Sequence, residues 1–234
     1  MWRVWCVVVL VGCGGSGPTG GPFGYVRLTS STVNASFWAR EGICPPTVES
    51  MVGACWIGSD DRACGTDVDA HAPADLAVSF PEMRPLVFEP DPKDHWIYGY
   101  ATWPPGSVLT IDATGGDVPQ FQGTVTIPTP VPAVDGLAQG TIIDRAQDLT
   151  LRWPAQPGMS LWVGISAGHA SFDCQFDAGA GTGVIPDGVL SALPSGKGDA
   201  HADIGFTNEI HPEGWRILLQ SYADVPDLDT VTLN

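Results

Sequence analysis

Short runs of β-forming residues, each ended by glycine, proline, asparagine or aspartate, follow one another through most of the chain. The 234 residues include 29 glycines and 21 prolines, which leave little room for long helices because proline breaks a helix interior. Short runs separated by turn residues are typical of antiparallel all-β domains. The sequence therefore predicts an all-β chain with at most one short helix, over residues 186–194, which prolines bound at both ends.

Two packed antiparallel sheets, forming a sandwich of immunoglobulin-like or jelly-roll topology, are the expected arrangement. A period of two places Phe172, Cys174 and Phe176 on one face, so we expect Cys174 in the core. We interpret residues 23–234 as one sandwich domain, with 44–75 as a loop-rich part of it. Strands are expected over residues 25–29, 35–39, 52–57, 77–80, 96–102, 107–112, 123–127, 148–153, 160–166, 171–176, 204–208, 215–222 and 230–233.

The charge balance excludes some classes of partner. With 26 acidic against 10 basic residues, the formal net charge is −16. A surface of this sign repels phosphates, which excludes nucleic-acid binding. Only 15% of the residues are charged and 44% are hydrophobic, a composition that excludes a disordered chain. We find no convincing phosphate-binding loop and expect no cofactor other than, at most, Ca²⁺.

The first residues predict a location. Arg3 precedes an apolar run over residues 4–12. At about 1.5 Å per residue, this run is too short to cross a hydrocarbon layer of about 30 Å. Leu10-Val11-Gly12-Cys13 ends the run and resembles the lipobox of bacterial lipoproteins. The resemblance implies that residues 1–12 are a signal peptide and that Cys13, modified with lipid such as palmitate, becomes the first residue of the mature protein.

The residues after the cysteine fit this interpretation. Residues 13–22 consist almost entirely of glycine, serine, proline and threonine, a composition typical of a flexible tether. Gly14, in place of an aspartate after Cys13, implies an outer-membrane address in the cell envelope by the sorting pattern of such lipoproteins. We therefore expect a membrane anchor made by the N-terminal lipid.

The second half of the chain carries GGDVPQF, DLTLRW, CQF and GTGVIPDGVLSALP in this order. These motifs resemble uncharacterised β-rich lipoproteins of high-GC bacteria. The resemblance covers about half of the chain. It implies a β-rich fold and brings no particular activity with it.

The cysteines after the anchor are Cys44, Cys55, Cys64 and Cys174. An even number of cysteines in an exported chain favours two disulfide bonds. We expect one bond within the group of three and one between that group and Cys174. A zinc site is the rival interpretation, but the spacings lack a C-x-x-C pair.

Two segments contain residues that could hold a divalent cation. Asp199, His201 and Asp203 share one face if their segment is a strand, and carboxylates with an imidazole are metal ligands. The alternative is a solvated edge strand whose charges prevent unwanted pairing. Asp67 and Asp69 lie in an acidic, glycine-containing loop whose oxygen atoms suit Ca²⁺. That loop lacks the ligand spacing of an EF-hand, and a plain solvated loop is the alternative.

Trp96, Tyr98 and Tyr100 share one face of an expected strand. If exposed, they could stack on sugar rings or anchor a protein partner; if buried, they belong to the core, which we favour. Ser166 lies within a G-x-S-x-G sequence that matches the nucleophile elbow of hydrolases. We interpret that sequence as a hairpin and expect no catalytic residue, because one strand ends there and the next begins within a few residues.

Together these features predict a lipid-anchored envelope protein that is a non-catalytic binding, adhesion or structural module. Its partner would be a protein or a glycan. The alternatives are a secreted hydrolase and a Ca²⁺-stabilised glycan-binding module.

Overall fold

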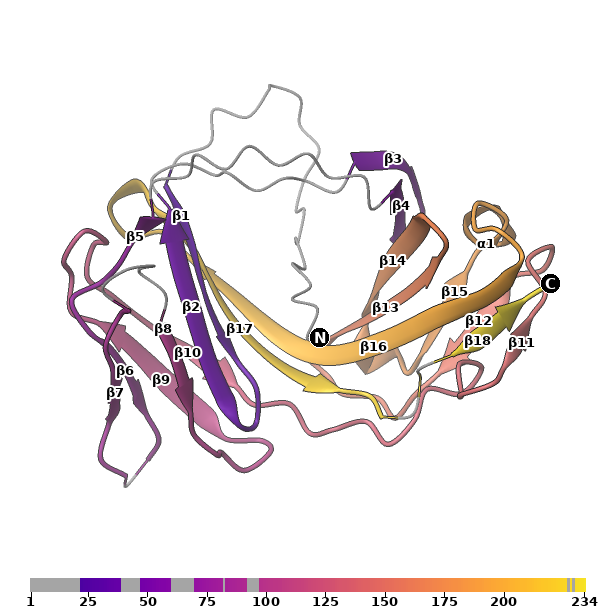
Figure 1. Ribbon diagram of the computed structural model, residues 1–234. Helices are drawn as coiled ribbons and strands as arrows, with labels where there is room; N and C mark the ends of the chain where they lie inside the picture. The colour runs from indigo at the N-terminus through magenta and orange to yellow at the C-terminus, as the bar shows by residue number, and fades with distance from the viewer. Residues whose placement is uncertain are drawn as a thin grey trace.

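The computed structural model describes residues 22–38, 47–59, 70–81, 83–91, 97–226, 228 and 230–234, and in these ranges the protein is all-β. One large, mostly antiparallel sheet runs through the whole molecule, and smaller sheets pack against it at both ends (Figure 1). A single short α-helix, α1 (Asp187–Leu190), lies within the predicted range 186–194. The expected all-β antiparallel sandwich with at most one short helix is confirmed.

The large sheet contains most of the strands. In pairing order these are β3 (Thr47–Val52), β4 (Cys55–Ser59), β14 (Ala170–Asp177), β13 (Ser160–Ala167), β16 (Gly196–Ile210), β17 (Arg216–Asp224), β1 (Phe23–Leu28), β2 (Thr32–Trp38) and β5 (Ala70–His71). β8 (Ile97–Tyr100) also pairs with β2, and β18 (Val231–Leu233) pairs with both β16 and β11 (Ile142–Ile143). The second layer consists of a four-stranded sheet in the order β10 (Phe121–Thr126), β9 (Val108–Ala113), β6 (Leu76–Ser79) and β7 (Leu86–Phe88), and of the pair β12 (Leu149–Arg152) and β15 (Thr182–Ile185).

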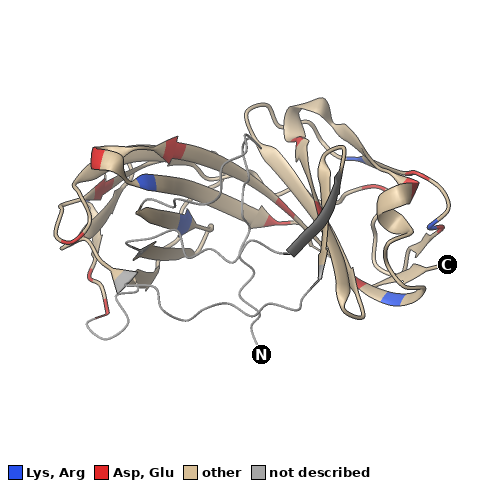
Figure 2. Cartoon of the chain, turned by 90° about the horizontal axis from the view of Figure 1, so that it is seen from above, with Lys and Arg blue, Asp and Glu red and all other residues tan. Residues whose placement is uncertain are grey.

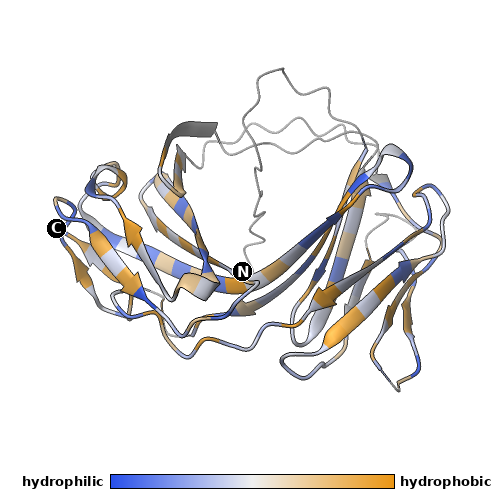
Figure 3. Cartoon of the chain, turned by 180° about the vertical axis from the view of Figure 1, so that it is seen from behind, coloured by the Kyte–Doolittle hydropathy of each residue, from blue (hydrophilic) through white to orange (hydrophobic). Residues whose placement is uncertain are grey.

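Two hydrophobic cores lie between these layers. The first, core 1, packs β13, β14 and one half of β16 against β12, β15 and α1. The second, core 2, packs β1, β2 and β17 against β6, β9 and β10. Strands in both halves show alternating apolar and polar positions, as Figure 3 shows by colour. Because of this alternation, one face of each strand points to a core and the other face points away from it.

β16 connects the two cores because its fifteen residues extend from one to the other. Ala202 and Ile204 are buried in core 1, whereas Phe206 and Ile210 pack against core 2. The sequence predicted only residues 204–208 of this strand. The rest of β16 was missed because glycines, a lysine and three charged or ionisable residues interrupt the apolar pattern at its start.

The other predicted strands all overlap observed ones, with differences at their ends. The range 52–57 contains a tight turn at Gly53, whose φ of 61° suits glycine, so β3 ends and β4 begins inside it. Within 44–75, the strands β3, β4 and β5 belong to the large sheet. The parallel pairing of β1 with β17 joins the first strand to nearly the last one, which no local pattern indicated.

A disulfide bond joins Cys55 of β4 to Cys174 of β14. The two residues are direct partners in the antiparallel register, and their Cα atoms are 4.0 Å apart. Cys174 is fully buried, with Phe172 on the same face, as the period of two predicted. The expected bond from the cysteine group to Cys174 is therefore confirmed. Cys44 and Cys64 lie outside the described residues, and so does the second bond predicted within the group.

No helix in the described ranges has both the length and the apolar character needed to cross a membrane. Acidic positions, drawn red in Figure 2, are spread over both halves of the molecule, and few positions are basic.

Candidate functional site

The face of the large sheet opposite the cores is concave (Figure 1). Most of the polar side chains described below belong to this face. On β16, every second residue from His201 to Glu209 lies on this face, because the residues between them point to the cores. We call it the inner face. It is continuous across both halves, since the same strand supplies its residues on each side.

His201 and Asp173 meet on the inner face across Gly164. Residue 201 of β16 and residue 173 of β14 are both register partners of Gly164 on β13. The His201 Nε2 atom lies 3.1 Å from Asp173 Oδ1, and both side chains are about two-thirds buried. A Cβ atom at Gly164 would overlap the imidazole ring and the carboxylate. Glycine is therefore required here by a close approach of two other side chains.

The pKa of His201 reflects this pairing. Burial lowers its pKa, but the hydrogen bond and charge of Asp173, together with the charge of Asp203, outweigh burial, so the net shift is upward. The protonated imidazole is thus stabilised between two carboxyl groups.

Asp203 and Asp224 form a carboxyl pair beside it. They are direct partners in the register of β16 with β17. Burial raises the pKa of Asp203 from 3.8 to about 7, with further contributions from the hydrogen bond and charge of Asp224, while His201 and Arg27 oppose the shift. Asp203 is therefore protonated up to about pH 7 and donates a hydrogen bond to Asp224.

The next group on the inner face consists of two aromatic rings and one arginine. The Trp162 and Tyr222 rings are 5.3 Å apart, and the Arg27 guanidinium lies 5.0 Å from the centre of the Tyr222 ring. The two rings meet over Gly205, where a Cβ atom would overlap both of them. Burial raises the pKa of Tyr222 to about 12, so its hydroxyl stays protonated. These contacts hold the three side chains in place where the two halves of the inner face meet.

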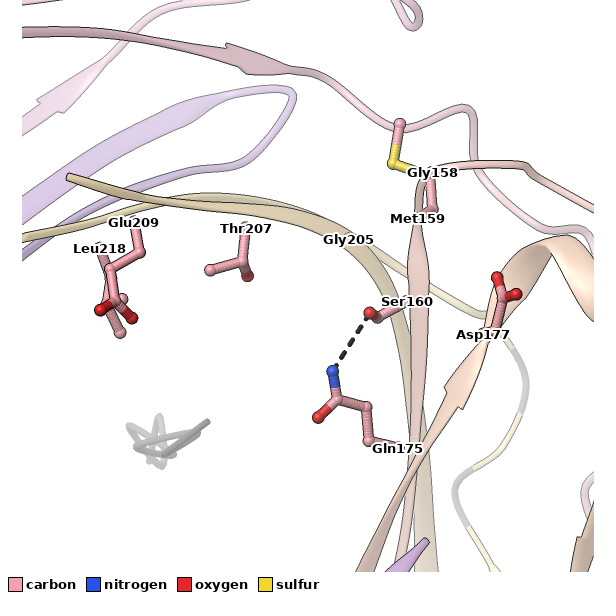
Figure 4. A pocket seen from close by; sticks show the side chains of 9 residues that line it. All are labelled: Gly158, Met159, Ser160, Gln175, Asp177, Gly205, Thr207, Glu209 and Leu218. Atoms are coloured by element: carbon pink, nitrogen blue, oxygen red, sulfur yellow. Dashed lines mark hydrogen bonds between the residues drawn. The ribbon is translucent and has the colours of Figure 1, made fainter. Parts of the chain in front are cut away.

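A groove of about 430 Å³ opens on the inner face beside this group (Figure 4). Ser160 and Gln175, joined by a hydrogen bond of 3.2 Å, form one side, and Thr207 and Glu209 form the other. Its full lining is Gly158, Met159, Ser160, Gln175, Asp177, Gly205, Thr207, Glu209 and Leu218. Five of these nine residues have polar side chains, two are glycines, and two, Met159 and Leu218, are apolar.

Several buried polar atoms of the inner face have no hydrogen-bond partner. They are Asn34 Oδ1, Ser36 Oγ, Trp162 Nε1 and Thr207 Oγ1. Ser36 and Trp162 are each only 2% exposed. A buried polar atom without a partner costs about 1–3 kcal/mol, and native structures contain few of them. These four atoms on one face leave hydrogen-bonding capacity unsatisfied there.

The structure brings part of the predicted metal site together. Asp199, His201 and Asp203 share the inner face of β16, as expected for a strand. β16 as a whole is not an edge strand, because β13 lies on one side and β17 and β18 on the other, although residues 199–202 pair only with β13. His201 and Asp203 are engaged by Asp173 and Asp224, and within the described ranges no group of three or more potential ligands is arranged to hold a metal ion. Asp67 and Asp69 lie outside those ranges.

Tyr98 and Tyr100 are exposed, so the core interpretation is wrong for them. Tyr98 is 52% and Tyr100 77% exposed, and their rings make an edge-to-face contact with centres 5.1 Å apart. The hydrogen bond between the two hydroxyls raises the pKa of Tyr98. β8 buries Ile97 and faces core 2 with Gly99, which leaves the tyrosines on the inner face at the open edge of the sheet. Trp96 lies outside the described residues.

The G-x-S-x-G sequence is part of a hairpin, as predicted. Ser166 lies inside β13, and Gly168 with His169 forms the turn to β14. A nucleophile elbow needs its serine at a turn from a strand into a helix, which this segment does not provide. Cys13, the predicted lipidation site, lies outside the described residues.

Sequence reasoning missed Asp224, Arg27 and Tyr222 as members of the site. Alternation placed Asp173 and Gln175 opposite the core, but it could not say which strands lie beside β14. The register of distant strands decides these contacts, and a single sequence carries no signal for it.

No protein-family model matches the sequence, and no curated protein sequence matches it either. Among solved structures, the chain is similar to the FN1-FN3 domains of chicken CNTN1, with 11% identity and a TM-score of 0.23 over 88% of this chain and 67% of that one. It is also similar to a structure described as "host cell surface retention of a 1.5-MDa bacterial ice-binding adhesin", with 11% identity and a TM-score of 0.19 over 92% of this chain and 66% of that one. Both TM-scores are low, so neither likeness assigns a partner or an activity.

Proposed function

We propose that this protein is a non-catalytic binding module of the bacterial cell envelope that holds its ligand against the inner face. The observation that carries the proposal is the polar groove together with buried, partnerless polar atoms on the same face. A sheet face that buries such atoms is destabilised on its own and is stabilised when a ligand supplies the missing partners.

The chemistry of the inner face supports binding better than catalysis. His201 is held by Asp173, and Asp203 is hydrogen-bonded to Asp224, so both ionisable centres are paired with neighbouring side chains. Ser166, the candidate nucleophile of the hydrolase alternative, lies within a strand rather than at an elbow.

Binding is tested with the full chain purified in detergent. Wild-type protein is applied to a glycan array and to immobilised envelope proteins, beside a Thr207→Trp variant that fills the groove. We expect a bound species whose signal falls at least tenfold in Thr207→Trp. The control is Val184→Trp, since Val184 is exposed on β15 in the second layer. Equal signals from all three proteins would contradict the proposal.

We also propose that a lipid on Cys13 anchors the module, at the outer membrane, through the tether 13–22. The support is the lipobox-like Leu10-Val11-Gly12-Cys13 and the glycine-rich residues that follow it. Several acyl chains on one cysteine bind a bilayer far more strongly than a single chain does.

Metabolic labelling with a fatty-acid analogue tests the anchor. We expect label on the wild-type protein and none on Cys13→Ala, with Cys6→Ala as the matched control that keeps the label. Equal labelling of wild type and Cys13→Ala would contradict lipidation at this residue.

A further inference from the structure

A row of side chains crosses five strands of the inner face in direct register. It runs from Tyr98 on β8 through Asn34, Arg27 and Gln220 to Thr207 on β16. With strands about 4.8 Å apart, this row is about 19 Å long. At one end lies the exposed pair Tyr98 and Tyr100, and at the other end Thr207 lines the groove. The row thus runs from an exposed, edge-to-face tyrosine pair to the groove, and Gln220 between them is buried.

The partnerless atoms beside and within this row are of mixed type. Asn34 Oδ1 can only accept a hydrogen bond, Trp162 Nε1 can only donate one, and the hydroxyls of Ser36 and Thr207 can do both. An ion of one sign would need groups of one type. A sugar hydroxyl both donates and accepts, so an array of this kind suits a polyhydroxylated ligand.

The two carboxylates at the groove already have partners, which argues against a cationic ligand there. Glu209 lies 3.1 Å from Arg216 and 3.0 Å from His211, and Asp177 accepts a hydrogen bond from the Gly179 amide. These carboxylates, together with the formal net charge of −16 of the whole chain, repel an anionic ligand. An uncharged ligand fits both observations.

A protein partner fits this face less well. The central contacts of protein interfaces are apolar and aromatic pockets that exclude water. The groove has only Met159 and Leu218 as large apolar side chains, and the row between it and the tyrosines is polar.

We propose that an uncharged oligosaccharide lies over the row from Tyr98 to Thr207, with sugar rings stacked on Tyr98 and Tyr100 at one end and hydroxyl groups bound in the groove at the other. This assignment rests on the proposed binding function and names its ligand class. An extended chain of sugars, rather than a single sugar, matches a row of this length.

The test is calorimetric titration of the full chain in detergent with cellohexaose, maltohexaose and chitohexaose as uncharged probes, and with heparin and polygalacturonate as anionic ones. We expect at least one uncharged hexamer to bind and the anionic chains not to bind. The double variant Tyr98→Ala/Tyr100→Ala should bind about tenfold more weakly, and Thr207→Val, which keeps the side-chain volume, several-fold more weakly. Ile142→Ala, an exposed apolar position on β11, should bind like wild type.

The outcomes separate the ligand class from the binding function. Binding of no uncharged probe, or binding that neither the tyrosine variant nor Thr207→Val weakens, overturns the oligosaccharide assignment. If an envelope protein then binds and is lost in Thr207→Trp, the binding function stands without a glycan. If nothing binds in a Thr207-dependent way, both proposals fail. Thermal melting of each variant confirms that lost binding is not lost folding.

Discussion

Single glycines decide which side chains meet on the inner face. Gly164 leaves space in which His201 reaches Asp173, and Gly205 leaves space for Trp162 against Tyr222. In the sequence, Gly164 drew attention as part of a hydrolase-like motif. A glycine is needed at this position because side chains from the two flanking strands, β14 and β16, meet over it. Only the register of the strands shows this contact.

Replacing Gly164 by alanine should destabilise the fold. The added methyl group would overlap the His201 ring and the Asp173 carboxylate, so one of them must move. We expect a loss of about 1–3 kcal/mol in the free energy of unfolding, measured by urea denaturation. Gly188→Ala is the matched control, because nothing lies within 4 Å of a Cβ atom there and α1 favours alanine. A Gly164→Ala protein as stable as wild type would show that the pair is not tightly packed.

The stability of the protein should fall as the pH rises from 4 to 7. Asp203 keeps its proton to about pH 7 in the folded state but loses it near 3.8 when unfolded, so the folded state binds more protons over this range. The raised pKa of His201 acts in the same direction, since its contribution is present below 6.5 and is lost as the pH rises through its folded pKa. We expect a decrease on the order of 1–2 kcal/mol between pH 4.5 and 8, less than the full shift implies because solvent screens a partly exposed group.

Asp203→Asn separates the two contributions. The asparagine cannot ionise, so denaturation curves of this variant should show a smaller fall in stability over the same pH range. A variant with an unchanged pH dependence would show that Asp203 does not hold the shifted proton.

At the scale of elements, the sequence largely predicted where strands lie along the chain, but it did not predict which strands pair with one another. Alternation located β14 and placed Cys174 in the core, because burial on one face imposes a period of two. The start of β16 was missed since its charged residues resemble those of a solvated edge, whereas the strand is interior and its ionisable side chains pair on the inner face. Tyr98 and Tyr100 were assigned to the core because aromatic residues usually are buried, and nothing local showed that β8 is an edge strand.

The disulfide between β4 and β14 should contribute strongly to stability. It closes a loop with a sequence separation of 119 residues, so it removes much conformational freedom from the unfolded chain. The double variant Cys55→Ala/Cys174→Ala should unfold about 3–5 kcal/mol more easily in guanidinium chloride. If the variant and wild type have equal midpoints without reductant, the bond does not form in the purified protein.

At the scale of the whole molecule, two cores share one sheet. Core 1 and core 2 have separate second layers, yet β16 and β17 contact both. β16 is buried in core 1 and packs Phe206 and Ile210 against core 2, whereas β17 is buried in core 2 and packs Ala223 against core 1. We therefore expect the two halves to unfold together rather than as independent units.

Substitutions in either core test this coupling. Leu161→Ala in core 1 and Leu109→Ala in core 2 each remove a fully buried side chain and should cost about 2–5 kcal/mol. Hydrogen exchange should then show lower protection in both halves for each variant. Loss of protection confined to the mutated half would show that the shared strands do not couple the cores.

The place of β1 in the large sheet has a mechanical consequence. The first described strand lies between β2 and β17 rather than at an edge, and six residues of β1 pair with each neighbour. When a bound ligand pulls against the proposed anchor, the tension enters the body of the protein along β1, crosswise to its hydrogen bonds. Both ladders then carry the load in shear, so their bonds must fail together instead of one after another. A chain anchored through β1 should therefore withstand a pulling force between its anchor and its ligand without unfolding.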